Sequence, residues 1–433
     1  MKRKLENKLL EWKKHDKRKP VLLHGARQVG KTWMMKYFGE SHFDQYLYIN
    51  FEKEMRYRDL FKESLDPQRV LVALEILTGK KVIPGQTLLL FDEIQEAENG
   101  LTILKYFQED LPELHIIAAG SLVGIALEKQ SFPVGKVEFV KIDPLDLEEF
   151  FWATGNQRLN DLVCDGDWQT ISLLKEEFLN VLRDYYFVGG MPEAVQTFIE
   201  KKNHRDVREV QTQILLAYQQ DFARHAPGEV IPKIKIVWNS VVSQLAKENK
   251  KFVYGLMKKG ARAKEFETAL DWLEEYGLIT RIYNLKKAGL PLAAYRDLKS
   301  FKLFVLDVGL LGALAKLEIT TLINKNRLFQ EFKGALTEQF ACQELQAKHG
   351  KNIYYWTNPS GNAEVDFIFE HQSTIYPLEV KAAENLKSKS LKTFAAKYPG
   401  IHCYRTSTSN YRKEEWMTNV PLYAIGHLGL NDL

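Results

Sequence analysis

Residues 21–32 read Val-Leu-Leu-His-Gly-Ala-Arg-Gln-Val-Gly-Lys-Thr, a short apolar run followed by the pattern G-x-x-x-x-G-K-T. The two glycines of the pattern permit the turn and the close backbone approach that a Cβ atom would obstruct. Such a loop directs backbone N–H groups at a β-phosphate, Lys31 reaches the β- and γ-phosphates, and Thr32 offers a hydroxyl to Mg²⁺ at a helix N-terminus. With a helix expected over residues 33–38, we predict that ATP contacts Gly25, Ala26, Arg27, Gln28, Val29, Gly30, Lys31, Thr32 and Trp33.

A second apolar segment, residues 88–91, ends in the acidic pair Asp92 and Glu93. A buried parallel strand of this kind delivers its last side chains to the carboxyl edge of the sheet, beside the phosphate loop. Asp92 would hold Mg²⁺ through its hydration shell, and Glu93 would polarise the attacking water. Another strand, residues 115–120, precedes Ser121, which is a candidate γ-phosphate sensor or else an ordinary cap or turn residue. These patterns predict hydrolysis of ATP.

The composition fits a multidomain cytoplasmic protein. A length of 433 residues corresponds to about three domains. The net charge of +4 is too small to indicate nucleic-acid binding without local clustering. Cys164, Cys342 and Cys403 are scattered, so we expect neither a disulfide framework nor a zinc site. We also expect no signal peptide and no membrane association, because no apolar stretch is long enough.

The order of predicted elements indicates an α/β multidomain fold. Strands alternate with helical patterns over residues 20–142, as in a parallel sheet covered on both faces. Residues 143–225 are mostly helical, including segments at 146–152 and 176–186, and suggest a lid subdomain. The sequence Gly-Gly-Met-Pro-Glu at 189–193 ends one helix and allows a reversal before the next.

A small connector is predicted from residue 231 to 283. We expect helices at 233–247, 253–257 and 263–276 and a strand at 278–283, which together are typical of a winged helix-turn-helix that binds DNA. A basic cluster crowds this region: Lys247, Lys250, Lys251, Lys258, Lys259, Arg262 and Lys264. The third helix also carries Glu265, Glu267, Asp271, Glu274 and Glu275, which would repel a DNA backbone. Phosphate contact and a solvated surface therefore remain alternatives.

A β-hairpin predicted over residues 363–382 holds a second candidate site. Because strand side chains alternate between faces, Glu379 and Lys381 project the same way, and the hairpin can bring Asp366 beside them. Such a group suits metal-dependent phosphodiester cleavage, with Asp366 and Glu379 binding Mg²⁺ while Lys381 orients water. A solvated hairpin with an ordinary salt bridge is the alternative.

The helix predicted over residues 334–345 offers Glu338 as a further acidic ligand. A D-x(n)-E-x-K hairpin preceded by a helix glutamate resembles the PD-(D/E)XK nuclease superfamily. The whole chain is similar to a bacterial and archaeal group of uncharacterised AAA-type ATPases with a nuclease-like C-terminal region of unknown function. Besides the phosphate loop, the similarity covers residues 88–93, 120–122, 132–136, 144–145, 189–193, 301–311, 334–338 and 364–381.

The resemblance implies four domains: a P-loop ATPase domain (1–142), a helical lid (143–230), a winged-helix-like domain (231–300) and a nuclease-like domain (301–433). Lys136 stands where many members carry an arginine, so a cationic γ-phosphate finger is weaker here, with Arg183 and Arg224 as other candidates. Val365 replaces the proline that names the nuclease motif, but proline contributes nothing to metal binding.

Two functions remain open. In the first, ATP hydrolysis controls a domain that binds or cuts nucleic acid, more plausibly DNA than RNA. In the second, the chain is an ATP-dependent binding switch whose nuclease fold is a catalytically silent docking module. The sequence leaves the oligomeric state open, with a homo-oligomer as one alternative.

Overall fold

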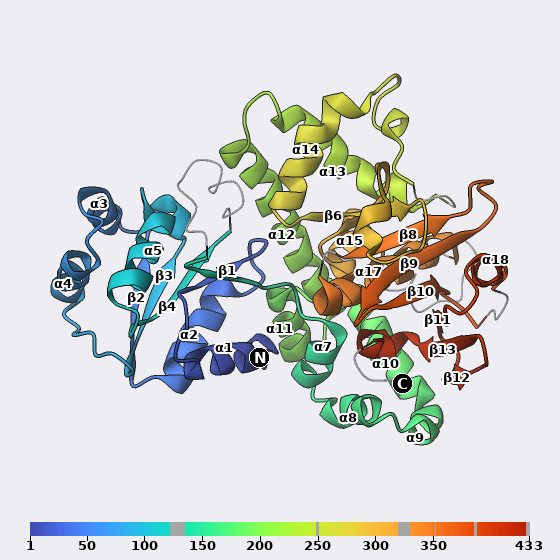
Figure 1. The fold of residues 1–433 in the computed structure, drawn as a ribbon, viewed down its shortest axis with the longest axis horizontal. Helices are drawn as coiled ribbons and strands as arrows, with labels where there is room; N and C mark the ends of the chain where they lie inside the picture. The colour runs from blue at the N-terminus through green and yellow to red at the C-terminus, as the bar shows by residue number, and fades with distance from the viewer. Residues whose placement is uncertain (122–134, 248–250, 319–329, 351, 385–387, 430–433) are drawn as a thin grey trace. The chain divides into compact units, whose positions relative to one another are not determined.

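The computed structural model describes residues 1–121, 135–247, 251–318, 330–350, 352–384 and 388–429. Its internal contacts divide the chain into two compact units (Figure 1). The N-terminal unit comprises residues 2–143 and 275–277, and the C-terminal unit comprises residue 1 with residues 144–274 and 278–433. Among the described residues, none of the helices combines the length and the apolar character that crossing a lipid bilayer requires.

A five-stranded parallel sheet with the order β2-β3-β4-β1-β5 forms the centre of the N-terminal unit. The strands are β1 (Val21–His24), β2 (Gln45–Asn50), β3 (Thr87–Asp92), β4 (His115–Gly120) and β5 (Glu138–Lys141). Both β3 and β4 are buried along their whole length, as expected of central strands covered on two faces. The predicted strands and the parallel sheet are confirmed.

Helices cover this sheet on both faces. Leu89 and Phe91 of β3 belong to the apolar cluster that includes residues of α3, α4 and α5. Because side chains alternate along a strand, Leu88 and Leu90 face the other side, where α2 packs against β2, β3 and β4. The helices are α1 (Leu5–Lys14), α2 (Lys31–His42), α3 (Met55–Glu63), α4 (Pro67–Thr78), the short 3₁₀ helix η1 (Ile94–Glu96) and α5 (Gly100–Asp110). The helix predicted after the phosphate loop is α2.

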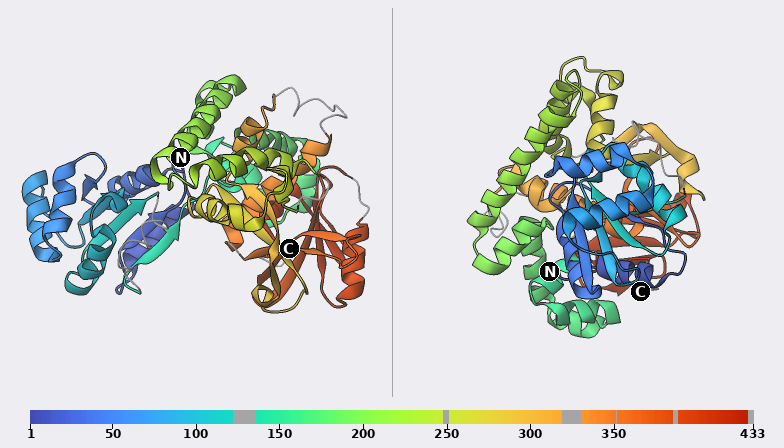
Figure 2. Two further views of the ribbon diagram at one scale, coloured as in Figure 1. Left: turned by 90° about the horizontal axis from the view of Figure 1, so that it is seen from above. Right: turned by 90° about the vertical axis from the view of Figure 1, so that its left-hand side faces the viewer.

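The first part of the C-terminal unit is helical (Figure 2). It contains α7 (Leu147–Ala153), α8 (Gln157–Asp165), α9 (Trp168–Leu173), α10 (Lys175–Val188), α11 (Pro192–Lys201), α12 (His204–His225), α13 (Ile231–Leu245), η2 (Tyr254–Leu256) and α14 (Ala263–Glu275). The break predicted at residues 189–193 falls between α10 and α11, as expected. Of the three connector helices, the outer two are α13 and α14, whereas the middle one is a single 3₁₀ turn.

The remainder of this unit is built on an eight-stranded mixed sheet with the order β12-β13-β11-β10-β9-β8-β6-β7. Its strands are β6 (Ile279–Leu285), β7 (Arg296–Val305), β8 (Ile353–Thr357), β9 (Glu364–His371), β10 (Thr374–Val380), β11 (Cys403–Ser407), β12 (Arg412–Lys413) and β13 (Met417–Pro421). The predicted hairpin of residues 363–382 is β9–β10, whose turn residues Gln372 and Ser373 have positive φ angles of 46° and 62°.

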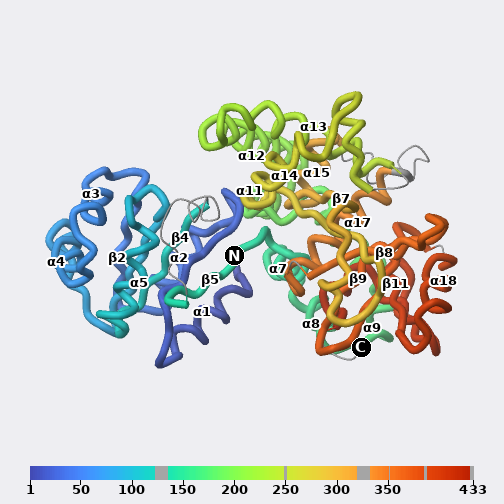
Figure 3. Tube along the Cα trace, turned by 45° about the horizontal axis from the view of Figure 1, so that its top comes forward, coloured from blue at the N-terminus to red at the C-terminus, as the bar shows by residue number. Residues whose placement is uncertain are grey.

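Helices α17 (Gln330–His349) and α18 (Lys389–Lys397) pack against this sheet, α17 on β7 to β10 and α18 on β9 and β10 (Figure 3). The other elements are η3 (Leu292–Tyr295), α15 (Val308–Leu314) and η5 (Leu422–His427). The strand predicted as the start of a wing is β6, which pairs with β7 and also with β8. The β6–β7 hairpin is therefore part of the C-terminal sheet. The domain boundary predicted between residues 300 and 301 falls inside β7.

A fully buried carboxylate, Asp307, joins the helical part of this unit to the sheet. Its Oδ1 accepts a hydrogen bond from Leu310 N (2.9 Å), and its Oδ2 accepts from Gly190 N (2.6 Å) and Gln343 Nε2 (3.2 Å). Burial raises the pKa of Asp307, and the backbone N–H donors oppose that rise. Gly189 has a φ of 70°, and a Cβ there would lie 2.1 Å from Asp307 Oδ1. Two motifs of the sequence, 189–193 and 301–311, thus meet at one carboxylate.

Replacing Asp307 by alanine should lower the free energy of unfolding of the C-terminal unit by about 3 kcal/mol, because buried donors would lose their acceptor. Urea unfolding followed by circular dichroism measures this loss. The control is Asp167→Ala, which removes a partly exposed cap that accepts from Thr170 N at 3.1 Å and should lower the free energy of unfolding clearly less. Equal losses in the two variants would contradict the assignment.

Candidate functional site

The phosphate loop lies between β1 and α2 and bends through residues with positive φ angles. These angles are 150° at Gly25, 66° at Gln28 and 96° at Gly30. A Cβ at Gly25 would lie 2.2 Å from the carbonyl oxygen of Ile142, so only glycine fits there. The loop ends at the N-terminus of α2, where free N–H groups favour an anion.

Lys31 is buried within this loop. Its ammonium donates hydrogen bonds to the carbonyl oxygens of Gly25 (2.9 Å) and Ala26 (2.8 Å). Burial lowers the pKa of Lys31 to about 8, although the nearby carboxylates of Glu93 and Asp92 oppose the shift. The Lys31 ammonium thus binds the loop carbonyls and is close enough to the acidic end of β3 to be influenced by its charge, and its contact with the phosphates stays a prediction.

Asp92, at the end of β3, is almost fully buried and hydrogen-bonded to the loop. Its Oδ2 accepts from Thr32 Oγ1 at 2.7 Å and from Tyr48 OH at 2.7 Å, and its Oδ1 accepts from Glu93 N at 3.1 Å. Thr32 and Asp92 are the two predicted Mg²⁺ ligands of this site. Thr32 Oγ1 and Asp92 Oδ2 are in hydrogen-bond contact, so two oxygen atoms of the kind that Mg²⁺ prefers lie side by side. These residues therefore fit Mg²⁺, bound either directly or through water.

Glu93 is held by two side chains, Ser121 after the neighbouring strand β4 and Gln95 two residues further along its own segment. Ser121 Oγ donates to Glu93 Oε1 at 3.4 Å, and Gln95 Nε2 donates to Oε2 at 2.6 Å. The structure therefore brings together Glu93 and Ser121, which the sequence places 28 residues apart. It also orients the Glu93 carboxylate, which is the group predicted to polarise water.

Sequence reasoning missed three residues at this site: Tyr48, Gln95 and Arg3. The buried Arg3 guanidinium donates to the carbonyl oxygens of Val29 (3.3 Å) and Asp143 (2.6 Å), so it ties the phosphate loop to the end of the unit. A basic N-terminus was visible in the sequence, but its partners depend on the tertiary fold.

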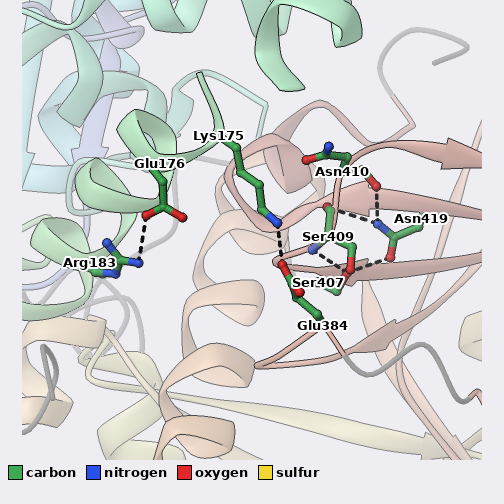
Figure 4. Close-up of polar contacts among 8 residues, drawn as sticks. All are labelled: Lys175, Glu176, Arg183, Glu384, Ser407, Ser409, Asn410 and Asn419. Carbon is green, nitrogen blue, oxygen red and sulfur yellow. Dashed lines mark hydrogen bonds and ion pairs between the residues drawn. The ribbon is translucent and has the colours of Figure 1, made fainter. Parts of the chain in front are cut away.

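Two of the candidate cationic fingers, Lys136 and Arg183, have other partners within their own units. Lys136 forms an ion pair with Glu109 (3.1 Å). Arg183 donates to Asn180 Oδ1 (2.6 Å). It also forms an ion pair with Glu176 (3.5 Å; Figure 4). A finger role for Lys136, Arg183 or Arg224 stays a prediction. Leu122, residues 132–134 and Lys250, which the sequence also singled out, lie outside the described residues.

The predicted nuclease-like residues lie together in the C-terminal unit. Lys381 Nζ pairs with Glu379 Oε1 at 2.9 Å, and Asp366 Oδ2 accepts from Val380 N at 2.8 Å. Burial, with repulsion from Glu338, raises the pKa of Asp366 to about 7. Attraction to Glu379, Asp366 and Glu338 outweighs burial and raises the pKa of Lys381.

A residue that sequence reasoning missed, Lys302, lies among these acids. Its side chain is fully buried, and its Nζ lies 2.5 Å from Glu364 Oε1, 3.7 Å from Glu338 Oε2 and 3.7 Å from Asp366 Oδ1. Burial alone would lower the pKa of Lys302, but these carboxylates raise it. A lone lysine inside the apolar run Phe-Lys-Leu-Phe-Val-Leu was the available signal. We call Glu338, Glu364, Asp366 and Glu379 the carboxylate cluster.

Metal-binding geometry is not found in this cluster. Within the described part of the chain, no group of three or more histidine, cysteine, aspartate or glutamate side chains is arranged to hold a metal ion. The cation closest to three of the carboxylates is the Lys302 ammonium. Because this ammonium occupies the space beside these carboxylate oxygens, the arrangement does not fit the Mg²⁺ that the nuclease resemblance implies.

Next to β10, strands β11 and β13 and helix α18 enclose a cationic cavity of about 380 Å³. It is lined by Ser388, Lys389, Lys392, Arg405, Arg412, Glu414, Trp416 and Met417. Arg405 is only 2% exposed and donates to Asn419 Oδ1 (2.9 Å) and Ser388 Oγ (3.2 Å). Asn419 in turn accepts from Ser407 and donates to the carbonyl of Asn410 (Figure 4). Four basic side chains and a tryptophan suit a phosphate with an aromatic base.

The acidic face of α14, which the sequence suggested would repel DNA, is offset in part by one cation. Arg281 of β6 pairs with Glu267 (2.9 Å), Asp271 (2.6 Å) and Glu274 (2.6 Å). Its pKa is raised despite burial, because of these carboxylates. Lys258 and Lys259 nearby are exposed. The electrostatic objection to phosphate contact in this region is therefore weaker than the sequence implies.

Three separate segments of the chain match family models. Residues 17–151 match an AAA domain, residues 179–321 match a domain of unknown function (DUF8612), and residues 333–425 match another domain of unknown function (DUF4143). The first match agrees with the parallel sheet and the phosphate loop. The N-terminal part of the chain is a P-loop AAA-type domain, as predicted, and it is joined to a C-terminal α/β region.

An uncharacterized protein of Methanocaldococcus jannaschii is 23% identical over 230 residues. The match covers 48% of this chain and 47% of that protein, so the chain spans about half the length of the curated relative it matches.

Similar solved structures include a Walker-type ATPase of Pyrococcus abyssi, with a TM-score of 0.44 and 16% identity over 72% of this chain and 95% of that chain. The Orc1 protein of Aeropyrum pernix in complex with DNA has a TM-score of 0.29 and 11% identity over 72% of this chain and 90% of that chain. AMPPCP-bound DnaA from Aquifex aeolicus has a TM-score of 0.27 and 14% identity over 64% of this chain and 89% of that chain.

Tyr48→Phe should weaken the Mg²⁺ dependence of nucleotide binding, because Asp92 would lose a donor that orients it. Partners of this kind typically contribute about 10-fold or more to metal affinity. A titration of Mg²⁺ against a fluorescent ATP analogue measures the shift. The matched control is Tyr46→Phe on the same strand, whose hydroxyl donates to Glu40 at 3.0 Å. An identical Mg²⁺ requirement in both variants and the unchanged chain would remove Tyr48 from the site.

Proposed function

We propose that this chain is a Mg²⁺-dependent ATPase of the cytoplasm. The observation that carries the proposal is the 2.7 Å hydrogen bond from Thr32 to Asp92, which unites the phosphate loop with the acidic end of β3. Each predicted role has a group in reach: Lys31 for the phosphates, Thr32 and Asp92 for Mg²⁺, and Glu93 for the water.

In the proposed reaction, the N–H groups at the start of α2 and the Lys31 ammonium hold the β- and γ-phosphates. Mg²⁺ would supply charge neutralisation between these phosphates. Glu93 accepts a hydrogen bond from the attacking water, and its two oxygens stay oriented because Ser121 and Gln95 bind them. In this proposal, Ser121 also senses the γ-phosphate. A fixed carboxylate needs no rearrangement during the reaction.

For the C-terminal unit, we propose the docking function rather than cleavage. The nuclease-like residues are present, but the Lys302 ammonium lies beside three carboxylates of the cluster. The cationic cavity and the exposed lysines before α14 favour nucleic acid as the partner, with DNA preferred over RNA. A winged-helix-like connector and a homo-oligomeric assembly belong to the same proposal.

Two substitutions separate ATP binding from hydrolysis. Lys31→Ala should abolish binding, because its charge acts on both the bound and the reacting phosphate. Glu93→Gln should bind ATP normally and hydrolyse it about 10²-fold or more slowly, because only the water loses its base. Phosphate release and binding of a fluorescent analogue are the measurements. Glu63→Gln, an exposed change on α3, is the control. Equal hydrolysis by the unchanged chain and Glu93→Gln would overturn the role of Glu93.

Two pairs of substitutions test where DNA binds. Each pair removes two positive charges. The first pair is Lys258→Ser with Lys259→Ser, and the second is Lys389→Ser with Lys392→Ser. A pair that neutralises DNA phosphates should weaken binding for all sequences and reduce the salt slope by about one for each lysine that binds a phosphate. Fluorescence anisotropy at several salt concentrations measures both effects.

The control pair, Lys80→Ser with Lys81→Ser, is exposed on the N-terminal unit. If neither test pair differs from this control, the nucleic-acid proposal is wrong. In the same mixtures with Mg²⁺, the DNA should stay intact. Cleavage that is abolished in Asp366→Ala would instead support the nuclease function.

A further inference from the structure

Lys302 is a fully buried cation whose Nζ lies 3.7 Å from an oxygen of two predicted metal ligands, Glu338 and Asp366. We infer that the Lys302 ammonium is a built-in counter-cation of the carboxylate cluster, so that the cluster is assembled and stable without any divalent metal. This goes beyond the proposed ATPase activity and depends only on the C-terminal unit.

The geometry around Lys302 is that of a counter-ion site. Its Nζ lies 2.5 Å from one carboxylate oxygen and 3.7 Å from two others, which come from α17 (Glu338) and β9 (Glu364 and Asp366), while Lys302 itself lies on β7. A buried ammonium of this kind is stable only with opposite charge beside it, and removal of either partner leaves an uncompensated charge. A Mg²⁺ ion bound to the same oxygens would need them at about 2.0–2.1 Å, in the space that the ammonium takes.

The remaining carboxylate, Glu379, has its own cation. Lys381 Nζ lies 2.9 Å from Glu379 Oε1. Asp366 also accepts a hydrogen bond from the backbone N–H of Val380. Each member of the cluster therefore has an ammonium of this chain nearby, either Lys302 or Lys381. The other oxygen of Glu379, Oε2, is buried without a hydrogen-bond partner.

The first experiment is a titration of the full chain with Mn²⁺ in the absence of nucleotide, followed by electron paramagnetic resonance. The comparison is between the unchanged chain and the variants Glu379→Gln and Asp366→Asn. We expect the same amount of bound Mn²⁺ in all three, because any ion at the phosphate loop is common to them. An additional ion in the unchanged chain that both variants lose would overturn the inference.

The second experiment removes the ammonium. Lys302→Met keeps the length of the side chain and should lower the midpoint of thermal unfolding, with partial recovery when Mn²⁺ is added, because the cluster then lacks a cation. Lys299→Met, an exposed change on the same strand, is the matched control. It should change neither the midpoint of thermal unfolding nor the response to Mn²⁺. If Lys302→Met does not fold, the double variant with Glu364→Gln removes one negative charge and should recover folding.

The second experiment tests whether the Lys302 ammonium is the cation that stabilises the carboxylate cluster. Recovery by Mn²⁺ or by Glu364→Gln supports the inference. A Lys302→Met protein as stable as Lys299→Met would overturn it, and so would an unstable protein that neither Mn²⁺ nor Glu364→Gln restores. Loss of ATP hydrolysis in any of these variants bears on neither result, because both readouts are taken without nucleotide.

Discussion

The burial of charge is the constraint on which both units depend, because a charge taken out of water must meet an opposite charge or several hydrogen-bond donors. Asp92 meets the hydroxyls of Thr32 and Tyr48. Asp307 meets backbone and amide N–H groups. Lys302 meets carboxylates. In each case, at least one compensating group comes from a segment distant in sequence, so satisfying the charge also fixes how those segments pack.

The ATP site was predictable from the sequence to the extent that its chemistry is local. A phosphate loop places its glycines, lysine and threonine within one turn, and an apolar strand carries Asp92 to a known edge of the sheet. Tyr48 was not predictable, because its contact with Asp92 requires that β2 be the neighbour of β3. Strand order is a property of the whole sheet, and no spacing in the sequence encodes it. Arg3 was missed because its partners depend on the tertiary fold. Gln95 lies only two residues after Glu93, so its contact is local, but no motif marks it.

The carboxylate cluster was predictable in part. Strand alternation and a short hairpin place Asp366, Glu379 and Lys381, because these relations extend over only a few residues. Lys302 lies on β7, which is separated from β9 by β6 and β8 in the sheet, and the sequence contains no sign of that arrangement. The motif around Lys302 was recognised but had no assigned role. The role of Lys302 follows from its contacts with carboxylates of α17 and β9, which only the folded structure shows.

The packing of α17 explains why Glu338 reaches Lys302. Gln339 exchanges two hydrogen bonds with the backbone of Val305, at 2.9 and 2.7 Å, and Gln343 accepts from Val308 N at 2.9 Å. These buried amides fix the register of α17 along the end of β7, because sliding by one residue would leave several polar groups unpaired. Glu338 precedes Gln339, so the register that satisfies the glutamines also sets its distance from Lys302. The backbone contacts therefore position the charge cluster, and the cluster does not need a metal ion to organise it.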